Sequence, residues 1–176
     1  MPAAIDRRLI ETFLAVAAID GVSGNERGVA DFIAARLAEV GLSLHEDGAA
    51  EASGGNCGNL VARAGDGGEI VLLAHMDTAR STAGMRPILQ TDRITSDGTT
   101  VLGVDDRAGV AALLHAAERV MAVRGSTAHF SLAFTICEET TLAGSRHLAI
   151  DPRWRHGFVF DSSQRPGRFI AGSYGC

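Results

Sequence analysis

The stretch EIVLLAHMD, residues 69–77, is the strongest strand signal in the sequence. Five consecutive apolar residues, some of them β-branched, precede His75, and a run of this length is typical of a strand buried on both faces of a sheet. Asp77 follows two positions later, so in an extended chain both side chains point to the same side. The pair is either a core histidine with a polar neighbour or the beginning of a metal site.

Helical and strand-like segments alternate around this stretch. Apolar residues at three- and four-residue spacing predict helices at 5–19 and 23–41, and Ser23 with Glu26 forms the pattern of a capping box at the second. A third helix is predicted at 105–125 and a short one at 141–150. The predicted strands are 42–46, 58–64, 128–139 and 156–163, with a further one at 167–175, while 84–103 is loop and hairpin with a turn at Asp97-Gly98.

This alternation predicts one domain of the α/β class, a three-layer α/β/α sandwich around a mixed, mostly parallel sheet. The net charge of −5 argues against nucleic acid and an anionic membrane surface as partners. Apolar runs do not approach the ~20 residues of a membrane span. Arginines and acids interrupt the apolar pattern of residues 1–21, and the three cysteines form no C-x-x-C pair, so we expect a cytoplasmic protein.

Acidic residues or histidine recur where the predicted strands end and where the long helix begins. Each alone is ordinary, because a lone acid at a strand end is usually solvated and an acid at a helix start caps free amides. Their recurrence at successive junctions favours one cluster, since the carboxyl ends of parallel strands share one edge of a sheet. Imidazole and carboxylate ligands suit Zn, Co or Mn, and several carboxylates suit a two-metal site. The residues concerned are His75, Asp77, Asp105, Asp106, Glu138, Glu139 and Asp161.

Four ordered motifs resemble a known family: HMDT (75–78), TSDGTTVLGVDDRAGVAAL (95–113), CEETTLAGS (137–145) and GFVFDSS (157–163). The pattern is similar to the co-catalytic zinc metallopeptidases that include peptidase T, carboxypeptidase G, acetylornithine deacetylase and succinyl-diaminopimelate desuccinylase. DGTTVLGVDD looks most like the peptidase T-like branch. The resemblance implies a hydrolase that cleaves amide bonds of short peptides by a metal-activated water, with two Zn²⁺ ions per site (Co²⁺ or Mn²⁺ as substitutes).

The resemblance also implies roles for individual residues. His75, Asp105 and Asp161 would bind one metal, Asp105 and Glu139 the second, with Asp105 as the bridge and a cis peptide bond between Asp105 and Asp106. Glu138 would be the general base and acid, and Asp77 would orient His75. One departure is Thr140-Thr141, where the family usually has Ile-Gly or Val-Gly.

Family members are about twice as long, and a lid or dimerisation domain, through which many form homodimers, interrupts their catalytic domain. We therefore expect residues 1–176 to be the amino-terminal part of one catalytic domain, without the last histidine ligand of the second metal, and weakly active or inactive alone. The remaining histidines are poor substitutes for that ligand. An uncovered apolar sheet edge should promote association.

Three alternatives remain open from the sequence. The substrate could be an N-acyl amino acid rather than a short peptide, or the chain could bind metal without catalysis. A related co-catalytic aminopeptidase family has its own HxD, DD and EE motifs, but it inserts a domain between the first two, where this chain has only residues 78–104.

Overall fold

A computed structural model describes residues 6–161 and contains a five-stranded mixed sheet. Its order is β1-β2-β6-β3-β7. β2 is antiparallel to both neighbours, whereas β3 is parallel to β6 and β7, so β2 alone runs against the other four. This confirms the α/β class and the mixed, mostly parallel sheet. The strands are β1 (Ser43–Glu46), β2 (Leu60–Ala64), β3 (Ile70–His75), β6 (Phe130–Thr135) and β7 (His156–Val159).

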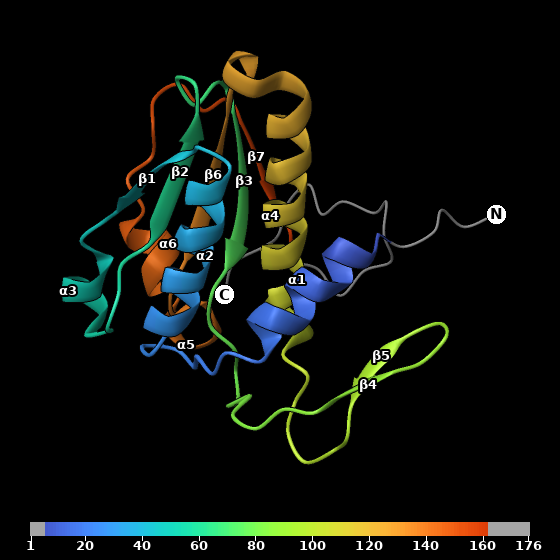
Figure 1. Ribbon diagram of the computed structural model, residues 1–176. Coiled ribbons are helices and arrows are strands. Elements are labelled where there is room, and N and C mark those ends of the chain that lie inside the picture. The colour runs from blue at the N-terminus through green and yellow to red at the C-terminus, as the bar shows by residue number, and fades with distance from the viewer. Residues whose placement is uncertain (1–5, 162–176) are drawn as a thin grey trace.

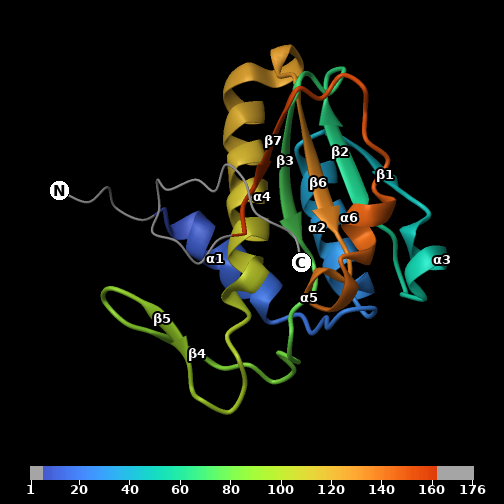
Figure 2. The same cartoon turned by 180° about the vertical axis from the view of Figure 1, so that it is seen from behind.

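Three longer helices lie on one face of this sheet, α1 (Arg7–Ala17), α2 (Arg27–Glu39) and α4 (Val104–Arg124) (Figure 1). Apolar side chains fill the space between this layer and the sheet because α2 turns its buried residues toward β1 and β2, and α4 turns its own toward β3. The opposite face carries the short helices α5 (Glu138–Thr141) and α6 (Ala143–His147) (Figure 2). The main core includes Val29, Ile33, Val110, Leu114, Leu132 and Phe134, all almost inaccessible to solvent.

Two short elements lie outside these layers. They are α3 (Ala49–Ser53), which follows β1, and a single 3-10 turn (Gly125–Thr127), which ends α4. The sequence pattern did not predict α3, whose five residues are too few for a helical period to show.

The beginning of α2 differs from the expected capping box. Ser23 Oγ donates a hydrogen bond to Asp77 Oδ2 at 2.5 Å, and the first amide of the helix, the Arg27 N–H, donates at 3.0 Å to the side-chain oxygen of Asn56, 29 residues away. Glu26 Oε1 accepts instead from the backbone N–H groups of Gly24 and Cys137. Long-range partners have therefore replaced the local ones that the S-x-x-E pattern indicated.

The segment between the HxD and DD motifs contains only the hairpin of β4 (Pro87–Leu89) and β5 (Ile94–Ser96), which projects away from the sheet (Figure 1). It holds no inserted domain. The chain reverses at residues 90–93, whereas Asp97-Gly98 forms a turn after β5, with Gly98 at a φ of 88°. The Asp97-Gly98 signal thus marks a turn, but not the one that joins the two strands.

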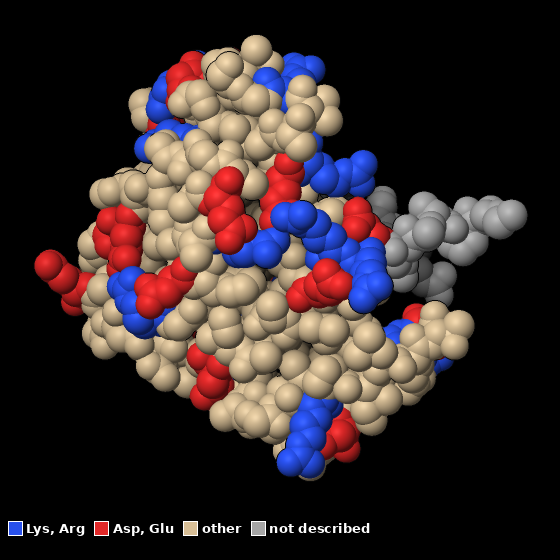
Figure 3. Space-filling model, viewed as in Figure 1, with Lys and Arg blue, Asp and Glu red and all other residues tan. Residues whose placement is uncertain are grey.

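Two remaining expectations concern the ends and the surface. The strand predicted at 167–175 lies outside the described residues. No helix within residues 6–161 combines the length and the apolar character needed to cross a membrane. On the face in Figure 3, basic and acidic side chains alternate in small groups without an extended basic area.

Candidate metal centre

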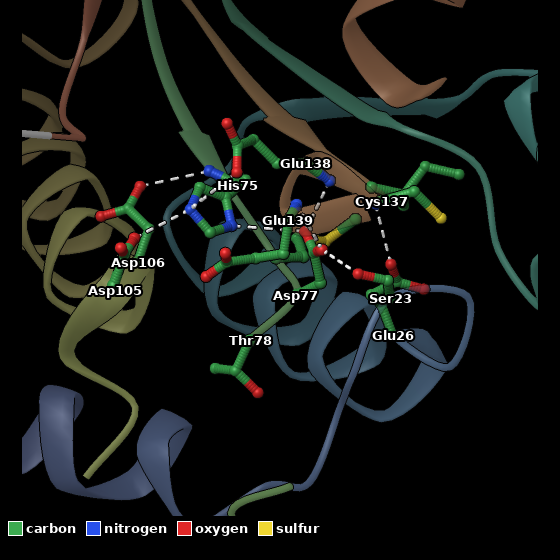
Figure 4. A network of polar contacts seen from close by, with 12 residues as sticks. Ser23, Glu26, His75, Asp77, Thr78, Asp105, Asp106, Cys137, Glu138 and Glu139 are labelled. Carbon is green, nitrogen blue, oxygen red and sulfur yellow. Dashed lines mark hydrogen bonds and ion pairs between the residues drawn. The ribbon is translucent and has the colours of Figure 1, made fainter. Parts of the chain in front are cut away.

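The carboxyl ends of three parallel strands bring the sequence-predicted residues to one edge of the sheet. His75 is the last residue of β3, Glu138 and Glu139 follow β6, and Asp161 follows β7. Asp105 reaches the same place from the first turn of α4 (Figure 4). The register of β3 with β6 and β7 explains the convergence, since strands about 5 Å apart end together here.

The Nε2 atom of His75 faces three carboxylates from three different elements. It lies 3.0 Å from Asp105 Oδ1, and 3.9 Å from both Glu138 Oε2 and Asp161 Oδ2. His75 is itself almost completely buried. Two overlapping groups could hold a metal ion, each with its ligand atoms within 4.8 Å of one another: His75, Glu138 and Asp161, and His75, Asp105 and Glu139.

Asp77 connects the imidazole to the turn after β6. Its Oδ1 lies 3.3 Å from His75 Nδ1, within ion-pair distance although the geometry is not that of a hydrogen bond. The backbone N–H groups of Glu138 and Glu139 donate to Asp77 at 3.0 and 3.1 Å, and Ser23 donates to the same carboxylate. Asp77 is fully buried, so it has no solvent to replace these contacts.

Asp105 and Asp106 have different surroundings despite being adjacent. The peptide bond between them is cis, as the resemblance implied. Asp106 is buried and accepts from the N–H groups of Gly109 at 3.0 Å and His75 at 3.2 Å. The helix-capping interpretation is therefore correct for Asp106, whereas the Asp105 side chain is 67% exposed and turns toward His75.

The sequence suggested that Glu138 and Glu139 end an extended strand, and this prediction is wrong. β6 stops at Thr135, Cys137 adopts a left-handed backbone with φ 51°, and the two glutamates begin the short helix α5. The Cys137 conformation turns the chain sharply at the sheet edge. The two side chains still separate, because Glu138 belongs to one candidate group and Glu139 to the other.

The electrostatics of the cluster are those of crowded carboxylates. Burial raises the pKa of Glu138, and the nearby Asp161 and Glu139 raise it further. Burial also raises the pKa values of Glu139 and Asp161, and Asp105 adds to both shifts. A cation among these groups would relieve both the repulsion and the loss of hydration.

The groups beneath the cluster shift more strongly. Burial alone would lower the pKa of His75, but the carboxylates of Asp77, Asp106 and Asp105 outweigh it and raise that pKa to about 9. Burial opposes ionisation of Asp77, yet its contacts with His75 and Ser23 and the two backbone donors lower its pKa to about 2. Burial raises the pKa of Asp106 to about 8.

Sequence reasoning missed a buried arginine that supports the HxD motif. Arg107 is fully buried and donates to the carbonyl of Met76, the residue between His75 and Asp77. It also donates to the carbonyls of Ile19 and Gly21. Burial lowers its pKa to about 10, against the opposing effect of Asp77, Asp20 and Glu26, so it stays charged at neutral pH. Its position directly after the DD pair was the available signal.

Comparisons with known proteins identify the family. A profile described as Peptidase family M28 matches residues 59–163, which include every residue of the cluster. The chain belongs to peptidase family M28. This M28 chain is also 28% identical over 171 residues to the uncharacterized protein YqjE of Bacillus subtilis (strain 168), an alignment that covers 94% of the chain and 46% of YqjE.

Solved structures confirm the resemblance to the peptidase T-like branch. A tripeptidase from Staphylococcus aureus subsp. aureus Mu50 superposes with a TM-score of 0.79 and 32% identity, over 90% of the M28 chain and 44% of the tripeptidase. Aminopeptidase PepT from Bacillus cereus ATCC 10987 superposes with a TM-score of 0.78 and 30% identity, over 88% of the chain and 43% of PepT. The chain thus spans somewhat less than half the length of these relatives.

Proposed function

We propose that the chain carries the metal ligands and the proton-transfer group of a peptidase that cleaves amide bonds in short peptides. The observation that supports this most directly is the set of carboxylates around His75 Nε2. Similarity to a tripeptidase and an aminopeptidase supports short peptides as substrates. We further propose that residues 1–176 are the amino-terminal part of the catalytic domain, and that the protein is cytoplasmic, as the buried free thiols of Cys57 and Cys137 favour.

The residues fit divalent metal ions of the zinc type. Imidazole nitrogen and carboxylate oxygen are the ligands that Zn²⁺ accepts, with Co²⁺ and Mn²⁺ as substitutes. We propose that His75, Asp105 and Asp161 would hold one ion. Asp105 and Glu139 would hold a second ion more weakly, since His75 is the only histidine in either candidate group within residues 6–161.

In the proposed reaction, bound metal would polarise the scissile carbonyl and lower the pKa of a water molecule. Glu138 would take a proton from that water and pass it to the leaving nitrogen, a role that its one-third exposed side chain and raised pKa support. Asp77 orients the His75 ring from behind and, by accepting from the N–H groups of Glu138 and Glu139, holds the general base at the same edge.

Two substitutions test this assignment. Glu138→Gln should leave zinc content unchanged and abolish hydrolysis of tripeptides, whereas His75→Ala should lower zinc content. Metal analysis of the purified chain should find one tightly held ion, and two would contradict the proposed weak second site. Activity of the isolated chain should be weak, so the assay needs a high protein concentration.

The same assay separates the alternatives. If the chain hydrolyses N-acyl amino acids in preference to tripeptides, then N-acyl amino acids are the substrate class and short peptides are not. Zinc binding without hydrolysis of either, also in a form extended by downstream sequence, would make the chain a non-catalytic metal-binding protein. A wild-type chain that binds no zinc would refute the proposed function.

A further inference from the structure

Glu26 is a fully buried carboxylate at the beginning of α2, outside the candidate metal groups. Its Oε1 atom accepts from the backbone N–H of Gly24 at 2.9 Å and from that of Cys137 at 2.9 Å. Its Oε2 atom is buried without a hydrogen-bond partner. A carboxylate removed from water is costly unless its surroundings compensate, so this position needs an explanation.

The Cys137 contact places Glu26 against the turn that carries the two glutamates. Cys137 directly precedes Glu138 and has a positive φ of 51°, a conformation that costs a non-glycine residue free energy and persists only where neighbours hold it. Figure 4 shows Glu26 and Ser23 below this turn, on the side of α2. The bond from the Cys137 N–H fixes the residue at which the chain leaves the direction of β6.

Three consecutive backbone N–H groups are therefore held by two buried carboxylates. Cys137 donates to Glu26, and Glu138 and Glu139 donate to Asp77. Asp77 is tied to the same loop through Ser23, three residues before Glu26. Because Asp77 also faces His75, Glu26 is the one of the two carboxylates that holds the turn without contacting the imidazole.

We infer that Glu26 is a positioning residue, which sets the Cys137 turn so that Glu139 reaches the second metal ion and Glu138 faces the first. The inference rests on the proposed function. It assigns Glu26 an effect on Glu138 and Glu139 but not on His75, Asp105 or Asp161, which come from other strands and from α4. A general loss of stability would weaken both metal-binding steps, whereas loss of positioning would weaken only the second.

Titration of the full chain with cobalt, monitored by calorimetry and visible absorption, distinguishes a loss of positioning from a general loss of stability. Glu26→Gln keeps an oxygen that can accept from Gly24 and Cys137, whereas Glu26→Asp keeps the charge but is one methylene shorter. We expect Glu26→Asp to weaken the second step about tenfold with an unchanged first step, the size typical for the loss of a partner behind a metal ligand. Glu26→Gln should stay within about threefold of wild type in both steps.

Leu37→Ala is the matched control, because Leu37 is buried in the same helix but about 16 Å further along its axis than Glu26. It should lower stability without selective loss of the second step. If Glu26→Asp binds the second cobalt ion as tightly as wild type, the inference is wrong but the proposed function still stands. The same holds if Glu26→Gln loses as much second-step affinity as Glu26→Asp. A wild-type chain that binds fewer than two cobalt ions would remove the proposed two-metal site, and the inference with it.

Discussion

Replacing Asp77 with asparagine tests the electrostatic basis of the site without any metal. The pKa of Asp77 is about 2 in the folded chain, against an ordinary value of 3.8. This lowering of the pKa corresponds to roughly 2–3 kcal/mol of folding stability. The side chain is fully buried, so solvent screening does not reduce this contribution. Because the folded pKa is lowered, the contribution is complete above about pH 4 and is lost as the pH falls toward 2.

Urea unfolding in the presence of a chelator measures this contribution, and the fluorescence of the single tryptophan, Trp154, monitors the transition. Near pH 6, Asp77→Asn should be less stable than wild type by about 2–3 kcal/mol plus a pH-independent cost of the amide group. Near pH 3 the pH-dependent part should fall to about half, because the wild-type carboxylate has begun to lose its advantage. Asp31→Asn, at a side chain 66% exposed, is the control and should show neither effect. A stability difference that stays constant between pH 6 and pH 3 would refute the assignment.

Three further perturbations follow from the same coordinates. Since the pKa of His75 is raised to about 9, its contribution to folding stability is lost as the pH rises from 6.5 to 9. Zinc must displace the His75 proton in order to bind, so calorimetry in buffers of different ionisation enthalpy should show proton release. For the same reason the zinc affinity should rise about tenfold per pH unit below pH 9. Gly109→Ala would place a Cβ atom 2.3 Å from Asp106 Oδ1 and should cost about 1–3 kcal/mol in urea unfolding, whereas Gly48→Ala, with open space around it, should cost much less. Val159 is 65% exposed on the edge strand β7, so Val159→Lys should reduce the self-association of the chain measured by light scattering. Unchanged self-association would exclude β7 as the edge through which chains associate.

The sequence predicted those parts of the molecule that a repeating pattern encodes. The apolar run before His75 and the helical spacing before Gly125 correspond to β3 and α4 almost residue for residue. Recurrence of acids at the junctions predicted the members of the cluster, because parallel strands necessarily end at the same edge of a sheet. The cis bond between Asp105 and Asp106 came from the family resemblance, since no local pattern encodes it.

The errors share a cause, which is that the partners lie far away in sequence. Ser23 and Glu26 have the spacing of a local cap, yet the hydroxyl donates to Asp77, 54 residues away, and the carboxylate accepts from Cys137, 111 residues away. The apparent strand exit at Glu138 is a helical turn because Glu26 and Asp77 hold its N–H groups. A cap pattern alone cannot reveal whether a stronger partner competes for the same side chain.

These same long-range contacts divide the acids of the cluster into two layers. The carboxylates of Asp77 and Asp106 are satisfied by backbone N–H groups and lie beneath His75, while Asp105, Glu138 and Asp161 remain partly exposed on its other side. Positive charge from Arg107 and from His75 offsets the buried pair. The exposed carboxylates crowd around the same imidazole nitrogen, so they are the groups whose repulsion a divalent cation would relieve. The division between satisfied acids below and crowded acids above therefore separates the residues that shape the site from those that we propose to bind metal or to transfer the proton.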